Sequence, residues 1–138
     1  MEKILVVAEA EIKPTENPEK VKKAITSLFS GDIVTEGEEN DYGLARLQGT
    51  SRESLEKFRM IIQRDRIRAA ARSQLFKGKE ESRIIVFLNK QVAYVGHVSF
   101  SAPEGESPLG PIRLEIQTAD PVKIIDWLTG GPMRRQDD

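Results

Sequence analysis

The segment Gln63–Lys79 carries the residues of this sequence best suited to bind an anion. Arg64, Arg68 and Arg72 are spaced four apart, so a helix would place them in one stripe. Arginine suits phosphate because its planar guanidinium donates two parallel hydrogen bonds. Like charges repel at this spacing, so an uncompensated stripe implies an external anion or distant carboxylates. The candidate nucleic-acid-binding residues are Arg59, Arg64, Arg66, Arg68, Arg72, Lys77 and Lys79.

The alternative is that these arginines serve the fold and not a ligand. Ala69–Ala71 would let the helix approach a sheet or a second subunit closely. Ile67 and Leu75 fall outside the predicted core stripe, which makes them candidates for an oligomer contact. The arginines would then pair with carboxylates within one chain or across a dimer. The acids available for this between two predicted strands are Glu36, Glu38, Glu39 and Asp41.

Residues that could support catalysis or hold a metal are scarce. The chain has no cysteine, which excludes disulfides, thiolate metal sites and cysteine nucleophiles. His97 is its one histidine, so no second imidazole completes a transition-metal site, and a structural role in a strand is expected. The turn with Glu38, Glu39 and Asp41 lacks EF-hand spacing, and the Gly-containing residues 101–111 lack the Lys-Ser/Thr pair of a P-loop. We therefore expect no catalytic residue, no metal site and no cofactor.

Charge is distributed unevenly along the chain. The 138 residues carry a net charge of -1, which argues against a general polyanion binder. Residues 59–79, however, hold seven basic residues and one acid, a net charge of +6, which leaves -7 for the remainder. Aromatic residues make up 6% of the chain, and no strand interleaves them with basic residues. RNA would therefore be bound through phosphate and shape, and not by base stacking.

Apolar periodicity predicts the elements that position these residues. Alternation predicts a strand over Ile4–Ile12, and Asn17-Pro18 is typical of a helix start. A helix from about Thr50 to Lys77 would turn a core stripe inward, and Gly78 would end it. Asp120-Pro121 starts a last helix, with Val122, Ile125 and Leu128 on one side. The predicted core stripe of the long helix is Leu55, Phe58, Ile62, Ala69 and Phe76, and the further strands are Asp32–Thr35, Tyr42–Gln48, Ile84–Leu88, Val92–Val98 and Ile112–Thr118.

The predicted element order is β-α-β-β-α-β-β-β-α. Short connections between strands favour a mostly antiparallel sheet with the helices on one face, an α+β fold. The length fits one domain over residues 1–130, followed by a loose tail over 131–138. No window is apolar enough for a signal peptide or a membrane span, so an intracellular, cytoplasmic protein is expected.

Three motifs give the chain a resemblance to a known family. The "RIRAAAR" of residues 66–72, the "PLGPIRLEI" of residues 108–116 and the "IIDWL" of residues 124–128 resemble an uncharacterised archaeal protein family of the UPF type. The resemblance covers nearly the whole chain. That family is similar in fold to the large-subunit ribosomal protein that contacts 5S RNA, and it has been described as RNA-binding or exosome-associated. The resemblance implies an archaeal source and an RNA partner, without an assigned reaction.

We therefore predict a non-catalytic RNA-binding domain that uses its basic second helix for phosphate contacts and takes part in RNA processing. The alternative is a structural or oligomerising module whose arginines pair with protein carboxylates. Neither interpretation implies a membrane or a small-molecule substrate.

Overall fold

The computed structural model describes residues 2–37, 41–103 and 109–130. The predicted tail over residues 131–138 and the acids Glu38 and Glu39 lie outside this part of the chain, and a single domain over residues 1–130 stays a prediction. The elements are, in order, β1 (Ile4–Ile12), α1 (Pro18–Thr26), β2 (Asp32–Glu36), β3 (Gly43–Gly49), the 3₁₀ helix η1 (Arg52–Leu55), α2 (Glu56–Arg64), α3 (Arg68–Lys77), β4 (Lys79–Glu80), β5 (Arg83–Asn89), α4 (Lys90–Tyr94), β6 (Pro111–Thr118) and α5 (Pro121–Leu128).

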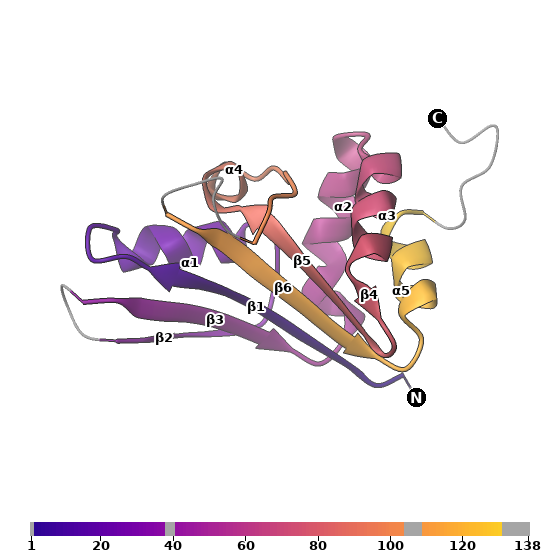
Figure 1. Cartoon of the computed structure of the whole chain (residues 1–138), viewed down its shortest axis with the longest axis horizontal. Coiled ribbons are helices and arrows are strands. Elements are labelled where there is room, and N and C mark those ends of the chain that lie inside the picture. Colours follow the sequence, from indigo (N-terminus) through magenta and orange to yellow (C-terminus); the bar gives the residue numbers. More distant parts are fainter. Residues whose placement is uncertain (1, 38–40, 104–108, 131–138) are drawn as a thin grey trace.

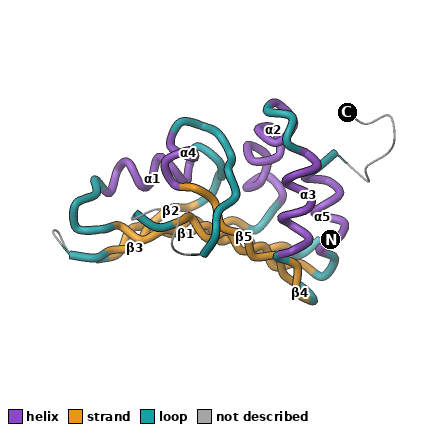
Figure 2. The backbone as a smooth tube through the Cα atoms, turned by 45° about the horizontal axis from the view of Figure 1, so that its top comes forward, coloured by secondary structure: helices purple, strands orange, loops and turns teal. Residues whose placement is uncertain are grey.

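The strands form one six-stranded sheet in the order β2-β3-β1-β6-β5-β4, and every neighbouring pair is antiparallel. The predicted hairpin is confirmed, because Asp32 pairs with Gln48 and Glu36 with Leu44. All the helices lie on the same side of the sheet, as predicted (Figures 1 and 2). No helix within residues 2–37, 41–103 and 109–130 covers the other face, which we call the uncovered sheet face. Every helix described is too short to span a lipid bilayer.

The core lies between the sheet and the helices. Successive β1 side chains alternate between the two faces, so Ile4, Val6 and Ala8 are buried beneath the helices. From the helix side, the rings of Phe29 and Phe58 pack 5.3 Å apart at an angle of 41°. Burying each such side chain contributes about 1.5–3 kcal/mol, and this packing holds α2 against the sheet.

Two helix starts follow their predicted chemistry. Asn17 accepts a hydrogen bond from the backbone N–H of Glu19 at 2.9 Å, and Pro18 follows as the first residue of α1. Asp120 accepts from the N–H of Lys123 at 3.2 Å and Pro121 begins α5 in the same way. Within α5, however, Val122 is 39% exposed, whereas Ile125 and Leu128, predicted to share its side of the helix, are fully buried.

The predicted helix from Thr50 to Lys77 is not continuous. It breaks after Arg64, and Arg66 adopts a left-handed φ of 56°. The N–H of Ile67 bonds to the carbonyl of Ile62 at 3.2 Å, and that of Arg66 to the carbonyl of Gln63 at 3.2 Å. This is a Schellman motif, which normally carries glycine where Arg66 stands. We call the turn over residues 64–68 the α2–α3 elbow.

The elbow changes which side of α3 is buried. Leu75 is fully buried, so it is not a candidate for an oligomer contact. Ile67 is half-buried and packs against the core, and its part in an oligomer contact stays a prediction. Ala69 is exposed and Phe76 is 38% exposed, so they are not core residues as predicted. The reason is that the left-handed residue rotates α3 relative to α2, which a single 100° periodicity cannot describe. Arg64, Arg68 and Arg72 therefore do not form one stripe on one helix.

A second correction concerns the predicted strand Val92–Val98. Residues 90–94 form helix α4 instead, because the Asn89 side chain accepts from the N–H of Val92 at 2.9 Å and caps a helix. His97 lies in the turn after α4 and not in a strand. The short strand β4, which pairs Lys79 with Ile84, replaces the lost strand at the sheet edge. The predicted element order was therefore wrong at this point.

Candidate nucleic-acid interface

The seven basic residues predicted to bind nucleic acid lie in three separate places. Arg59, Arg68 and Arg72 face the carboxyl end of α5, Arg64 and Arg66 lie at the α2–α3 elbow, and Lys77 and Lys79 lie at the far end of α3. The single surface expected from the sequence is therefore divided.

Arginines from α2 and α3 bind the last turn of α5. Arg59 Nε donates to the carbonyl oxygen of Trp127 at 3.0 Å, and Arg68 Nε donates to that of Thr129 at 2.7 Å. Arg72 Nη1 lies 3.2 Å from Thr129 Oγ1 and 2.7 Å from Asp126 Oδ1. The terminal carbonyls of a helix lack intrahelical partners and carry partial negative charge, so cationic donors stabilise them. We call Arg59, Arg68 and Arg72 the α5 clamp.

The clamp requires a small residue just after α5. Gly130 has a φ of +78°, and a Cβ at this position would lie 3.1 Å from Arg68 Nε. Glycine satisfies both the left-handed backbone and the close approach of the guanidinium. The clamp therefore joins three helices into one packed unit.

At the elbow, two polar side chains meet around one carboxylate. Arg64 Nε donates to Asp65 Oδ1 at 2.9 Å, and His97 Nδ1 lies 2.8 Å from Asp65 Oδ2. Arg64 Nη2 also donates to the Gly96 carbonyl oxygen at 2.9 Å. The hydrogen bond from Arg64, and after it that from His97, lowers the pKa of Asp65 to about 2. These contacts tie the end of α2 to the turn after α4.

The remaining candidate residues make fewer side-chain contacts within the fold than the α5 clamp does. Arg66 and Lys77 are exposed, and Lys79 is half-buried. The structure gives the side chains of these three residues no hydrogen bond or ion pair with another residue of 2–37, 41–103 and 109–130. The side chain of Arg64 is 57% exposed despite its contacts. Four basic side chains, on α2, the α2–α3 elbow, α3 and β4, are thus reachable from solvent.

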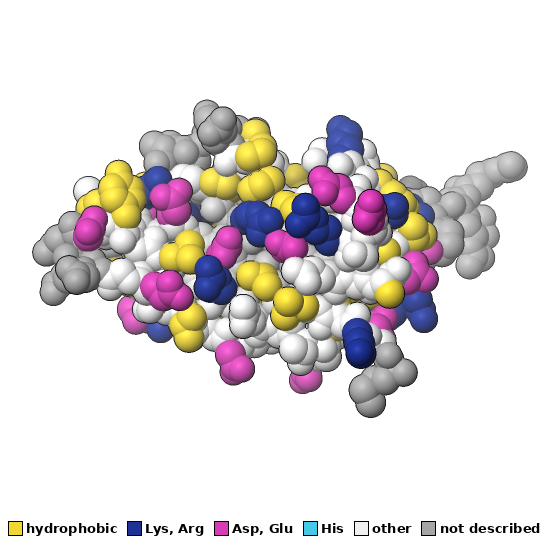
Figure 3. All heavy atoms as spheres, turned by 60° about the horizontal axis from the view of Figure 1, so that its bottom comes forward, with side chains coloured by type: hydrophobic (Ala, Val, Ile, Leu, Met, Phe, Trp, Pro, Cys, Tyr) yellow, Lys and Arg dark blue, Asp and Glu magenta, His cyan; other side chains and the backbone are white. Residues whose placement is uncertain are grey.

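Across the uncovered sheet face runs a chain of ion pairs that the sequence reading missed. Acids and arginines alternate along it, and its members come from all six strands. Blue and magenta side chains mix over this face in Figure 3. We call this set the sheet ladder: Glu36, Arg46, Glu9, Arg113, Glu115, Arg83 and Glu80, with successive N–O distances of 3.6, 3.1, 3.9, 2.9, 3.9 and 3.2 Å. Strand alternation could have placed these residues on one face, but their register could not be read from the sequence.

The acids expected to neutralise the basic helix mostly do something else. Glu36 belongs to the sheet ladder, and Asp41 accepts from the N–H of Tyr42 at 2.7 Å. Carboxylates in the described part of the chain that do pair with the basic segment include Asp65, Asp126 and Glu56. Among the described residues, no three or more His, Asp or Glu side chains are grouped so that they could share a metal ion.

Comparison with known proteins places the chain in a family. A family model described as RNA binding matches residues 5–118. A UPF0201 protein of Sulfolobus acidocaldarius is 44% identical over 90% of this chain and 86% of its own length. The chain belongs to the UPF0201 family. A relative from Metallosphaera sedula is 39% identical over 89% of this chain and 85% of its own length.

Solved structures agree with this assignment. The crystal structure of the UPF0201 protein from Methanococcus jannaschii matches with a TM-score of 0.81 and 33% identity, covering 91% of this chain and 98% of that one. A DUF54 protein from Archaeglobus fulgidus shares the fold, with a TM-score of 0.56 and 24% identity, over 83% of this chain and 86% of that one. The resemblance to an uncharacterised archaeal family is thereby confirmed, and so is the α+β antiparallel fold class. The likeness to the ribosomal protein stays a prediction.

Proposed function

We propose that this protein binds RNA through the phosphate backbone, and that the α2–α3 elbow is the centre of contact. The observation that carries the proposal is that Arg64 and Arg66 are both exposed at the same turn between α2 and α3, in a chain that matches a family model described as RNA binding. Guanidinium groups make charge-assisted, bidentate hydrogen bonds with phosphate oxygens. No catalytic role is proposed, and a place in RNA processing within the cytoplasm remains our expectation.

The seven basic residues have two different roles in this proposal. Arg64, Arg66, Lys77 and Lys79 are the proposed phosphate contacts. Arg64, Arg66 and Lys77 are exposed, and Lys79 is half-buried but makes no side-chain hydrogen bond or ion pair within the described residues. The arginines of the α5 clamp donate hydrogen bonds to the end of α5 and hold the helices in place. Its positive charge adds to the potential that attracts a polyanion, even where its donors are engaged.

The uncovered sheet face is a poor alternative surface for RNA. Each arginine of the sheet ladder lies between two glutamates, so its charge is already compensated. The ladder has four acids and three arginines, and a phosphate would have to displace a carboxylate to bind there. RNA is therefore expected to approach the helical side.

The test is a double variant, Arg64→Ala with Arg66→Ala, measured against labelled oligouridylate over a range of salt concentrations. Loss of two phosphate contacts should lower the slope of log Kobs against log salt by about 1.4, at about 0.7 per single-stranded phosphate. The matched control, Lys3→Ala with Lys20→Ala, removes the same charge from exposed positions elsewhere. Equal effects of the two double variants, or no binding by the natural chain, would refute the elbow as an RNA site.

A second function, a structural or oligomerising module, is favoured by the α5 clamp. Arg72 pairs with Asp126, and Arg59 lies 3.4 Å from Glu56, which are pairings with protein carboxylates. Under this alternative the natural chain binds no RNA at low salt. Alanine at Arg72 then lowers only the unfolding midpoint or the stability of a dimer.

A further inference from the structure

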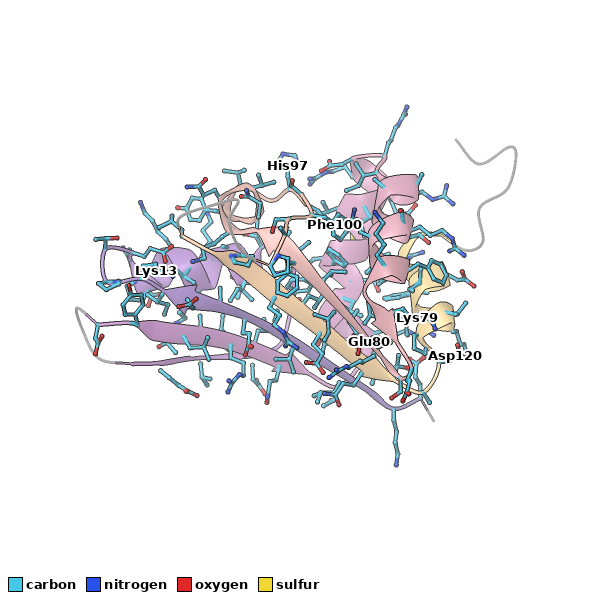
Figure 4. All side chains as sticks on the ribbon, in the orientation of Figure 1. Lys13, Lys79, Glu80, His97, Phe100 and Asp120 are labelled. Atoms are coloured by element: carbon cyan, nitrogen blue, oxygen red, sulfur yellow. The ribbon has the colours of Figure 1, made fainter. Side chains whose placement is uncertain are left out.

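His97 lies beside the proposed RNA contacts, on a different element. It comes from the turn after α4, whereas Arg64 and Asp65 come from the end of α2. Its side chain is 54% exposed, and Figure 4 shows it at the outer end of its loop, on the side away from the sheet. The elbow is thus joined by an imidazole for which the sequence predicted a structural role in a strand.

The contacts of His97 fix which nitrogen carries the proton. Asp65 is ionised near neutral pH and cannot donate, so the 2.8 Å contact requires a proton on His97 Nδ1. Arg64 Nη2 lies 3.3 Å from the same nitrogen, but a guanidinium has no acceptor, so this contact is not a hydrogen bond in that tautomer. Nε2 is then left as the basic atom, and no residue in the described ranges bonds to it.

We propose that protonated His97 is a phosphate contact of the elbow, so that RNA binding strengthens as the pH falls below neutral. This rests on the proposed function. A second proton enters at Nε2 and turns an outward-facing acceptor into a donor. Arg64, Asp65 and Arg66 together carry one positive charge, and the imidazolium doubles it.

The groups that face His97 favour this role. From α2, Asp65 holds the ring through Nδ1 and Arg64 lies against the same nitrogen, while the carbonyl of Gly96 is taken by Arg64. Asp65 offsets the repulsion between the imidazolium and the guanidinium. Its hydrogen bond also fixes the ring, so that Nε2 is presented with little loss of side-chain freedom.

The experiment measures binding of labelled oligouridylate at about pH 5.5 and about pH 7.5, on either side of the usual titration range of histidine. Uracil and the phosphodiester do not titrate between these values. The variant His97→Asn keeps an N–H donor near the position of Nδ1 but cannot be protonated, and His97→Gln is a second variant should the first misfold. Circular dichroism at both pH values is the control that each variant is folded.

The natural chain should bind up to about fivefold tighter at the lower pH, the ratio that one exposed ion pair produces. Its salt slope should also be steeper there by about 0.7. Both differences should vanish in His97→Asn. If that variant keeps the full pH dependence while the elbow double variant loses binding, His97 is not a contact and the proposed function stands. If the natural chain binds no RNA at either pH, both proposals are overturned.

Discussion

Arg68 Nε donates to the carbonyl oxygen of Thr129 at 2.7 Å, across a gap of 61 residues in sequence. This bond joins the start of α3 to the end of α5, and Arg72 one turn later repeats the connection. Arginines that the sequence presents as an anion-binding stripe thus serve first to join helices. Our proposal therefore places the anion contacts on the basic residues outside the α5 clamp, centred on the elbow between α2 and α3.

The pair Arg72–Asp126 should be worth more than a surface salt bridge. Its two side chains are 21% and 29% exposed, and the atoms lie 2.7 Å apart. Arg72→Ala also removes the contact with Thr129 Oγ1, so a loss of about 1–3 kcal/mol is expected, between exposed and buried pairs. Chemical denaturation should show it.

The matched control for this prediction is Arg83→Ala in the sheet ladder. Arg83 is 47% exposed, so this change should cost about 1 kcal/mol or less. A double-mutant cycle with Asp126→Asn isolates the pair energy. Equal losses for Arg72→Ala and Arg83→Ala would contradict the structural role assigned to the clamp.

Arg66→Gly should stabilise the protein. Arg66 occupies the left-handed position of a Schellman motif, where a residue with a Cβ is strained by about 1–2 kcal/mol and glycine is not. The higher entropy of glycine in the unfolded chain offsets part of this gain, so a net increase of about 0.5–1 kcal/mol is expected.

Arg66→Ala is the control, since it removes the same side chain and keeps the Cβ. It should give no such increase in thermal stability. Both variants should weaken RNA binding alike, because both lose the guanidinium. A glycine variant less stable than the alanine variant would show that the elbow is not strained.

The contacts of Asp65 at the elbow should stop stabilising the protein over a defined range of acid pH. The folded-state pKa of Asp65 is about 2, below its ordinary value of 3.8. A carboxyl with a lowered folded pKa stabilises the protein above the unfolded pKa, and this stabilisation is lost as the pH falls from about 4 to about 2.

Asp65→Asn should therefore flatten the fall in stability over this range, with little change in slope above pH 5 or so. Acid titrations followed by circular dichroism would detect it. Asp32→Asn, at an exposed strand position, serves as the control and should leave the curve unaltered. An unchanged acid limb in Asp65→Asn would mean that the Arg64 and His97 contacts do not persist in solution.

The sequence predicted the elements that carry an ordinary local signal. Asn17-Pro18 and Asp120-Pro121 begin helices because their side chains and ring geometry act locally. The alternation of β1 placed its buried face correctly. These features need no knowledge of tertiary contacts.

The predictions from sequence were wrong where the residue that usually marks a structural change was absent, or where the residue present fits two structures. Arg66 stands where glycine normally marks a helix end, so the break between α2 and α3 had no sequence signal. Asn89 fits both a tight turn and a helix cap, and the choice between them moved His97 out of a strand. The partners of Arg68 and Arg72 lie on α5, far along the chain, so the clamp could not be read from spacing.

Lys90 is a buried lysine whose ammonium contacts several segments of the chain. Its side chain is 5% exposed, and its ammonium donates to the carbonyl oxygens of Glu11 at 2.8 Å and Leu109 at 2.7 Å. Glu16 completes the set with Oε1 at 3.0 Å. Burial lowers the pKa of Lys90 while Glu16 raises it, with burial the larger effect. One lysine thus holds together the loop after β1, the start of α4 and the approach to β6.

Lys90→Met should cost several kcal/mol, because it keeps the apolar stem but leaves a nearly buried carboxylate and two carbonyls without their donor. Lys20→Met, on an exposed position of α1, should stay within about 0.5 kcal/mol. Adding Glu16→Gln to Lys90→Met should recover part of the loss, since the unpaired charge is then gone. Denaturant unfolding should be measured for the natural chain, the two single variants and the double variant. Equal stability of Lys90→Met and Lys20→Met would mean that the three segments are held by apolar packing alone.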